Sequence, residues 1–219
     1  MDLVIYDCDG VLVDSEIISC RVDAEAFTEA GFPTTVEYVA RHYVGHSVKS
    51  MLADMEARHG KRFPSDFAET LLHRTQAAFE GALRPVPGIR EVLDGNGGPK
   101  CVASSSRPER IRHSLALTDL LHHFEPHLFS AQMVSRGKPA PDLFLYAADR
   151  MATPSERCLV VEDSVAGVTA AVAAGMTVIG FTAASHCADD LADRLREAGA
   201  REVAPDAEAL MSVLSRFIG

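Results

Sequence analysis

The chain is poor in basic residues. It has 21 lysines and arginines against 31 aspartates and glutamates, and a formal net charge of −10. Proteins that bind nucleic acid need an extended positive surface, because contacts to the phosphate backbone supply much of their affinity. The deficit therefore argues against nucleic acid as a partner.

The chain also lacks paired metal-binding cysteines, histidines at metal-ligand spacing and long apolar runs. Its five cysteines include no Cys-x-x-Cys pair. Cys8, Cys101 and Cys158 lie in or beside strand-like apolar runs, where a thiol usually acts as a small hydrophobic side chain. No basic segment followed by an apolar one opens the chain, and no apolar stretch could cross a membrane. We expect a reduced, cytoplasmic protein without membrane contact, as a monomer or weak homodimer.

What is present is an alternation of short apolar runs and helix-like segments. Apolar residues make up 47% of the 219, which is enough for a sizeable core in one large domain or two unequal ones. The strand-like runs are 3–6, 101–103, 158–161 and 178–181, and the helix-like segments between them are 108–117, 141–151 and 165–174. This alternation predicts an α/β fold: a Rossmann-like, doubly wound parallel sheet covered by helices on both faces.

One region interrupts the alternation. Between residues 16 and 86 we find helix-like patterning and no convincing strand, in segments 17–30, 36–43, 47–59 and 64–82. Prolines at 85 and 87 stiffen the point where the chain returns. We therefore predict an inserted α-helical cap domain over residues 16–86 and a core domain formed by residues 1–15 and 87–219.

Two carboxylates follow the first strand at once. Residues i and i+2 of extended backbone face the same side, so Asp7 and Asp9 could enter one site while Gly10 lets the chain turn. Active sites of parallel sheets lie at the carboxyl ends of strands. Such a pair suits a metal-assisted reaction in which one carboxylate attacks and the other carries a proton. The alternative is an acidic turn that merely ends a strand.

Polar groups also follow the next two long strands. The run Ser104-Ser105-Ser106-Arg107 leads from a strand into a helix, a setting that suits phosphate binding or, alternatively, a serine helix cap. Glu162 and Asp163 end a fully apolar strand. Two acids near other carboxylates call for a hard cation such as Mg²⁺, unless Asp163 or Ser164 only caps the next helix.

Lys138 completes the set. It stands between Gly137 and Pro139, so it extends from a stiff loop and could neutralise a carboxylate nucleophile and a phosphate as a point charge. An isolated lysine is otherwise a solvated surface group. Together these strand-end positions supply a nucleophile, a proton carrier, a phosphate anchor, a cation and metal ligands, a coincidence that turn chemistry does not explain.

With these residues assembled, the chain resembles the haloacid dehalogenase superfamily of phosphohydrolases, in the branch with a helical cap inserted after the first strand. The resemblance covers essentially the whole chain. The motifs that carry it occur in the family's order: Asp7-x-Asp9-Gly10-x-Leu12-x-Asp14-Ser15, Ser104, Lys138-Pro139-x-Pro141-Asp142 and Glu162-Asp163-Ser164-x-x-Gly167. The run 161–180 is typical of the branch that contains sugar-phosphate phosphatases and β-phosphoglucomutase.

The resemblance implies a role for each position. Asp7 would attack phosphorus and form an aspartyl-phosphate, and Asp9 would protonate the leaving alcohol and then activate water. Mg²⁺ would be held by the Asp7 carboxylate, the Asp9 backbone carbonyl and Asp163, with Glu162 nearby or in its coordination shell. Dehalogenases of this superfamily lack the second acid, so the resemblance favours phosphate over halide chemistry.

The phosphoryl oxygens would be held by Ser104 and Lys138, beside Ser105. A proton role near neutral pH requires the pKa of Asp9 to rise about three units from its usual value of about 3.9. Ligation of its carboxylate to Mg²⁺ would lower that pKa instead. We therefore expect the Asp9 carboxylate to turn away from the metal, toward a cap that closes and dries the site.

The cap decides the substrate. The run Val44-Gly45-His46-Ser47 resembles the substrate-facing cap loop of this branch, which makes Gly45 and His46 candidate substrate contacts. The mutase pattern has a lysine before this glycine, an arginine three residues after it and a histidine near the start of the cap. This chain has Val44, Val48 and Ser19 there. These departures weaken the mutase alternative, because a bisphosphate intermediate needs a cation at both ends.

A Mg²⁺-dependent phosphatase of a small sugar or sugar-acid phosphate, such as 6-phosphogluconate, is thus the first hypothesis. A β-phosphoglucomutase-like phosphosugar mutase is the second, and a non-catalytic relative that binds a partner through its cap is the third. Other candidate substrate contacts, each with the alternative of a solvated helix residue, are Arg41, Lys49, Arg74 and Arg84.

Overall fold

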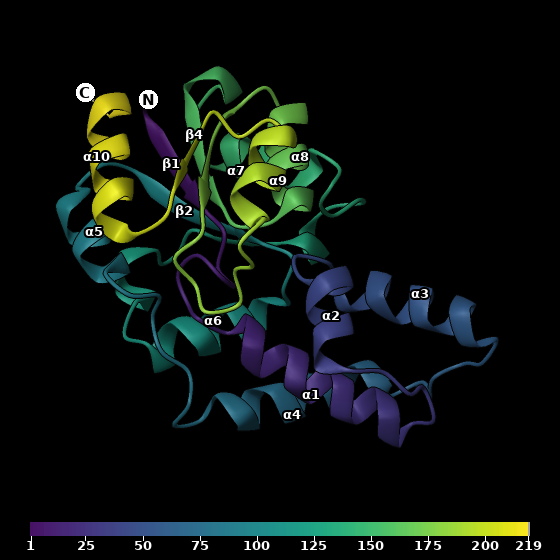
Figure 1. The fold of residues 1–219 in the computed structure, drawn as a ribbon. Helices are drawn as coiled ribbons and strands as arrows, with labels where there is room; N and C mark the ends of the chain where they lie inside the picture. The colour runs from purple at the N-terminus through teal and green to yellow at the C-terminus, as the bar shows by residue number, and fades with distance from the viewer. Residues whose placement is uncertain (219) are drawn as a thin grey trace.

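A six-stranded parallel sheet forms the centre of the computed structural model, which describes residues 1–218 (Figure 1). The strand order is β3-β2-β1-β4-β5-β6. The order reverses beside β1, and parallel sheets bind ligands in the crevice at such a point. Here the crevice opens at the carboxyl end of β1. The strands are β1 (Leu3–Tyr6), β2 (Lys100–Ser104), β3 (Leu128–Ser130), β4 (Cys158–Glu162), β5 (Thr177–Phe181) and β6 (Glu202–Ala204).

Helices cover both faces of the sheet. Alternate side chains of a strand enter different cores: Val4 and Tyr6 belong to one hydrophobic cluster, and Leu3 and Ile5 belong to the other. The first cluster includes α5 (Ile89–Gly95), α6 (Pro108–Leu117) and α10 (Ala207–Phe217). The second includes α7 (Asp142–Arg150), α8 (Val165–Ala173) and α9 (Leu191–Glu197). The expected doubly wound α/β fold is confirmed.

Four helices lie between β1 and β2 in the sequence and extend away from the sheet at the bottom and lower right of Figure 1: α1 (Glu16–Glu29), α2 (Val36–Tyr43), α3 (Val48–His59) and α4 (Phe67–Phe79). They share an aromatic-rich cluster of their own, in which the rings of Phe32 and Phe63 stack with centroids 3.8 Å apart. Phe79 and Leu83, where the chain returns, already pack into the sheet's first cluster. The division into a cap of residues 16–86 and a core stays a prediction.

The four expected strands and the expected helices are present within a few residues of their predicted ends. Two edge strands, β3 and β6, and three helices, α5, α9 and α10, were not expected. Within residues 1–218 all five cysteines are free, and Cys8, Cys101 and Cys158 are buried among apolar side chains as expected. None of the helices among these residues has the length and apolar character needed to cross a bilayer.

Two leucines on α7 provide a test of the packing. The side chain of Leu143 is fully buried against the sheet, whereas Leu145 is 43% exposed. We expect Leu143→Ala to lower the free energy of unfolding by about 2–5 kcal/mol, because it removes apolar contacts and leaves a cavity. Leu145→Ala, the matched control, should change it by about 0.5 kcal/mol or less. Urea denaturation measures both, and equal losses would contradict the packing.

Candidate active site

The loop after β1 begins the site. The Asp7 N–H donates to the Val161 carbonyl oxygen at 3.0 Å, which continues the pairing with β4 and fixes Asp7 at the point where the strand order reverses. Gly10 then turns the chain with a φ of +80°, a conformation that side chains rarely adopt. A Cβ at this position would lie 1.9 Å from Asp163 Oδ2. The loop after β1 therefore requires glycine at position 10, both for its backbone conformation and for its lack of a side chain.

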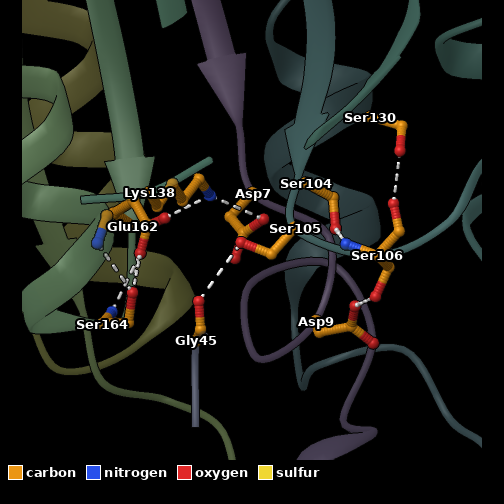
Figure 2. Close-up of polar contacts among 11 residues, drawn as sticks. Asp7, Asp9, Gly45, Ser104, Ser105, Ser106, Ser130, Lys138, Glu162 and Ser164 are labelled. Atoms are coloured by element: carbon orange, nitrogen blue, oxygen red, sulfur yellow. Dashed lines mark hydrogen bonds and ion pairs between the residues drawn. The ribbon is translucent and has the colours of Figure 1, made fainter. Parts of the chain in front are cut away.

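Lys138 joins two of the acids. Its ammonium nitrogen lies 3.0 Å from Asp7 Oδ1 and 2.5 Å from Glu162 Oε1, and all three side chains are buried (Figure 2). Burial alone would lower the pKa of Lys138, but Asp7 and Glu162 outweigh it and raise that pKa, so the ammonium stays charged. The alternative of a solvated surface lysine is excluded.

Glu162 is held from its other side by the start of α8. Its Oε2 accepts hydrogen bonds from the backbone N–H and the hydroxyl of Ser164, both at 2.9 Å. The Ser164 hydroxyl in turn caps the helix by accepting from the Gly167 N–H at 3.0 Å. A Cβ at Gly167 would lie 1.7 Å from Glu162 Oε1. This packing explains the spacing of the motif Glu162-Asp163-Ser164-x-x-Gly167, and it leaves both oxygens of Glu162 engaged.

Three carboxylates meet beside Lys138. One oxygen each of Asp7, Glu162 and Asp163 lie within 4.8 Å of one another. Burial and the neighbouring Glu162 and Asp163 raise the pKa of Asp7, against the effect of Lys138. Among residues 1–218, Asp7 Oδ1 and Asp163 Oδ2 are buried oxygens with ion-pair contacts and no aligned hydrogen bond. Hard oxygen donors gathered at one buried point fit a divalent cation.

Asp9 points away from this cluster (Figure 2), and one of its partners is Arg110 on α6. Its carboxylate accepts from the Ser15 hydroxyl at 2.6 Å, the Ser106 hydroxyl at 2.7 Å and Arg110 Nη2 at 2.9 Å. Burial by itself raises the pKa of Asp9, but Arg110 and these hydrogen bonds outweigh it, so that the pKa is lowered. The expected rise was wrong for this state of the protein, because three donors stabilise the charged form.

The serine loop after β2 connects the sheet to the helical insertion. The Ser104 hydroxyl accepts from the Ser106 N–H at 3.1 Å, and no serine caps α6, whose preceding residue is Arg107. The Ser105 hydroxyl donates to the Gly45 carbonyl oxygen at 3.2 Å. Since a Cβ at Gly45 would lie 2.6 Å from the Ser164 Cβ, the loop between α2 and α3 rests directly on the ends of β2 and β4.

A cavity of about 830 Å³ separates the insertion from the sheet and has the size of a small-molecule site. Its lining includes Asp7, Asp9, Ser104, Ser105, Gly45, His46 and Lys49. A second cavity of about 660 Å³ lies beside it and is lined by Arg41, His46, Asp163 and His186, among others. Two candidate contacts lie in neither lining: Arg74 pairs with Glu29 at 2.6 Å, and Arg84 donates to backbone carbonyls at the end of the insertion.

Several polar residues of the site were not anticipated. Arg110, Glu16 and Asp23 line the larger cavity, and His186 contacts Asp163 at 3.1 Å. Burial would lower the pKa of His186, but this contact raises it to about 11. His186 follows β5, so the rule that strand ends carry the site could have indicated it. The sequence indicates Arg110 less clearly, since its only signal is its position in the first turn of the helix that follows the serine loop.

Comparisons with known proteins agree with this geometry. The family model for haloacid dehalogenase-like hydrolases matches residues 1–175. The 6-phosphogluconate phosphatase of Escherichia coli (strain K12) is 34% identical over 188 residues, 85% of this chain and 85% of that protein. The phosphorylated carbohydrates phosphatase of Thermotoga maritima is 32% identical over 180 residues, 80% of this chain and 82% of that protein.

Solved structures give the same result. A conserved haloacid dehalogenase-like protein of unknown function from Agrobacterium tumefaciens superposes with a TM-score of 0.84 at 37% identity, over 100% of both chains. The resemblance inferred from the motifs is therefore confirmed over nearly the whole sequence. The chain belongs to the haloacid dehalogenase-like hydrolase family.

Proposed function

We propose that the protein is a Mg²⁺-dependent phosphatase that hydrolyses a small sugar or sugar-acid phosphate through an aspartyl-phosphate on Asp7. The observation that carries the proposal is the buried contact of Asp7 with Lys138, beside Asp163, at an edge of the 830 Å³ cavity. The phosphatases of E. coli and T. maritima named above support the reaction class and the kind of substrate.

Asp7 is the nucleophile of the first step. One of its carboxylate oxygens forms a bond to phosphorus while the bond from phosphorus to the ester oxygen breaks, and the alcohol leaves with a proton. Lys138 makes this approach possible, since its charge offsets both the carboxylate and the phosphoryl group that it attacks. Glu162 holds Lys138 in place through the 2.5 Å contact.

The acidic cluster has the donor set for Mg²⁺. We assign the Asp7 carboxylate, the Asp163 carboxylate and the Asp9 backbone carbonyl as its ligands, and Glu162 as a neighbour whose oxygens are already engaged. Bound there, Mg²⁺ would withdraw negative charge from the phosphoryl oxygens. Ser104, Ser105 and Lys138 would bind the same oxygens from the protein side.

Asp9 moves the proton. In the free protein its carboxylate is ionised, held by Arg110, Ser15 and Ser106. A phosphate ester in the cavity brings negative charge beside Asp9 and competes for Arg110, and both effects favour the protonated form. Asp9 then donates that proton to the leaving alcohol and, in the second step, takes a proton from the water that attacks the aspartyl-phosphate.

The cavity suits a substrate with hydroxyl groups and an acid group. Cations at Lys49, Arg107 and Arg110 and acids at Glu16 and Asp23 line it together. Val48, which also lines it, stands where the mutase pattern has a cation for a second phosphate. Gly45 and His46, in the loop resting on the sheet, are the proposed contacts from the cap. We therefore favour hydrolysis over phosphoryl transfer between two positions of one sugar.

The function is tested by phosphate release from a panel of phosphorylated sugars, sugar acids and nucleotides. We expect release from sugar or sugar-acid phosphates, loss of activity with a chelator and recovery on adding Mg²⁺. Asp7→Asn should abolish release, because an amide is a poor nucleophile. Asp193→Asn, an 80% exposed aspartate on α9, is the matched control. Full activity in the chelator would contradict the metal assignment, and full activity of Asp7→Asn would contradict the mechanism.

Asp9→Asn separates the two steps. With p-nitrophenyl phosphate, whose leaving group needs no proton, the variant should release one equivalent of nitrophenolate in a burst and then turn over about 10²–10⁴-fold more slowly than the wild type. With a sugar phosphate both phases should be slow. Rapid-quench measurements follow the burst and the labelled phosphoenzyme. Wild-type steady-state turnover in this variant would refute the proton role of Asp9.

The buried carboxyl of Asp23 should make the free energy of unfolding depend on pH. Burial raises the pKa of this carboxyl to about 7, against the effect of Arg110, whereas an unfolded aspartate has a pKa of about 3.9. Between these two pKa values the folded protein binds a proton that the unfolded chain has released, and this proton stabilises the folded state. The stabilisation is lost as the pH rises through about 7. Urea denaturation should show that Asp23→Asn stabilises the protein more at pH 8.5 than at pH 5. Asp193→Asn should show no such dependence, and an equal effect of Asp23→Asn at both pH values would contradict the raised pKa.

A further inference from the structure

The loop between β5 and α9 brings an imidazole against the acidic cluster. His186 Nε2 lies 3.1 Å from Asp163 Oδ2, and the two side chains are only 5% and 2% exposed. Each polar group would be costly to bury alone, so each provides the other with its partner. Neither the family motifs nor the proposed mechanism assigns a task to His186.

The position of this loop depends on the first motif of the chain. The Ser185 N–H and the Ser185 hydroxyl both donate to Asp14 Oδ1, at 3.0 and 2.8 Å. Asp14 thus holds the residue next to His186, although the two segments are 171 positions apart in the sequence. Asp14 is the one acid of the motif Asp7–Ser15 that the proposed mechanism does not use.

Gly10 allows the pair to approach the catalytic loop. A Cβ on Gly10 would lie 1.9 Å from Asp163 Oδ2 and 2.9 Å from His186 Cε1. The carboxylate is therefore confined between the glycine of the catalytic loop on one side and the imidazole on another. Confinement of this kind fixes the direction in which a carboxylate presents its oxygens.

We propose that His186 is a positioning residue for the cation site: it holds the Asp163 carboxylate in its binding orientation, and Asp14 acts through Ser185 to hold His186 there. This inference rests on one part of the proposed function, the assignment of Asp163 as a ligand of the cation. It differs from a simple charge effect, because an imidazolium beside the site would repel a divalent cation, and removing it would then tighten binding rather than weaken it.

Calorimetric titration with Mg²⁺ alone tests the proposal without any turnover. We expect His186→Ala to weaken binding by about 10–100-fold. His186→Gln, which keeps a polar N–H of similar reach, should recover most of the loss. His73→Ala, on α4 with a side chain 69% exposed, is the matched control and should bind as the wild type does. Unchanged or tighter binding by His186→Ala would overturn the proposal.

A variant at Asp14 tests the second part of the proposal, the role of Asp14 in holding His186. Asp14→Ala keeps His186 in the chain but releases its loop, so it should also weaken Mg²⁺ binding. The double variant Asp14→Ala/His186→Ala should bind no more weakly than His186→Ala alone, because both changes remove the same effect. Additive losses, or wild-type affinity of Asp14→Ala, would overturn the proposed connection. Thermal unfolding without metal checks that each variant folds, and Asp14→Ala carries the test if His186→Ala does not.

The two proposals fail in different ways. A wild-type protein that binds no Mg²⁺ overturns the metal assignment of the proposed function and this inference with it. A wild type that binds Mg²⁺ and releases phosphate, together with a His186→Ala variant of equal affinity, overturns only the positioning role.

Discussion

The structure depends on the need to compensate negative charge buried at one edge of a parallel sheet. Asp7, Glu162 and Asp163 approach within 4.8 Å of one another, with their side chains almost fully buried. Such a cluster persists only with positive charge beside it. Lys138 supplies one charge, and its contacts explain why it stands in a stiff loop with its head buried. The remaining oxygens fit a divalent cation, so the feature that is costly for folding is also the one on which the proposed phosphatase reaction depends.

Two aspartates of one motif differ because their surroundings differ. Asp7 lies among carboxylates and pairs with Lys138, the setting of the nucleophile in the proposed mechanism. Asp9, two residues later, turns toward α6 and accepts from two hydroxyls and from Arg110. The loop after β1 brings both aspartates to the site, but burial and side chains from distant parts of the sequence together shift their pKa values in opposite directions. Gly10 connects the two environments, since its missing side chain leaves room for Asp163.

The helical insertion places its own residues over this chemistry. The Gly45 loop touches Ser105 after β2 and Ser164 after β4, so it covers the ends of two strands that flank β1. The cavity beneath it contains charges of both signs and the apolar Val48. In the proposed function, recognition of the substrate would therefore come from the insertion and from α6, and the reaction would take place at the end of the sheet. This separation lets one catalytic edge serve many substrates in a family.

The central strands, most of the helices and five residues of the candidate site could be predicted from the sequence. The five residues are Asp7, Ser104, Lys138, Glu162 and Asp163. Strands buried on both faces are continuous apolar runs, and parallel strands end at one edge. The edge strands β3 and β6, three residues each, carry too little pattern to be recognised. The lowered pKa of Asp9 and the contact of Asp163 with His186 could not be predicted, because both depend on the tertiary structure. Arg110 lies 101 positions from Asp9 in the sequence. His186 lies in the loop between β5 and α9, outside the motif that contains Asp163. Contacts between such distant segments depend on packing geometry, which no local pattern records.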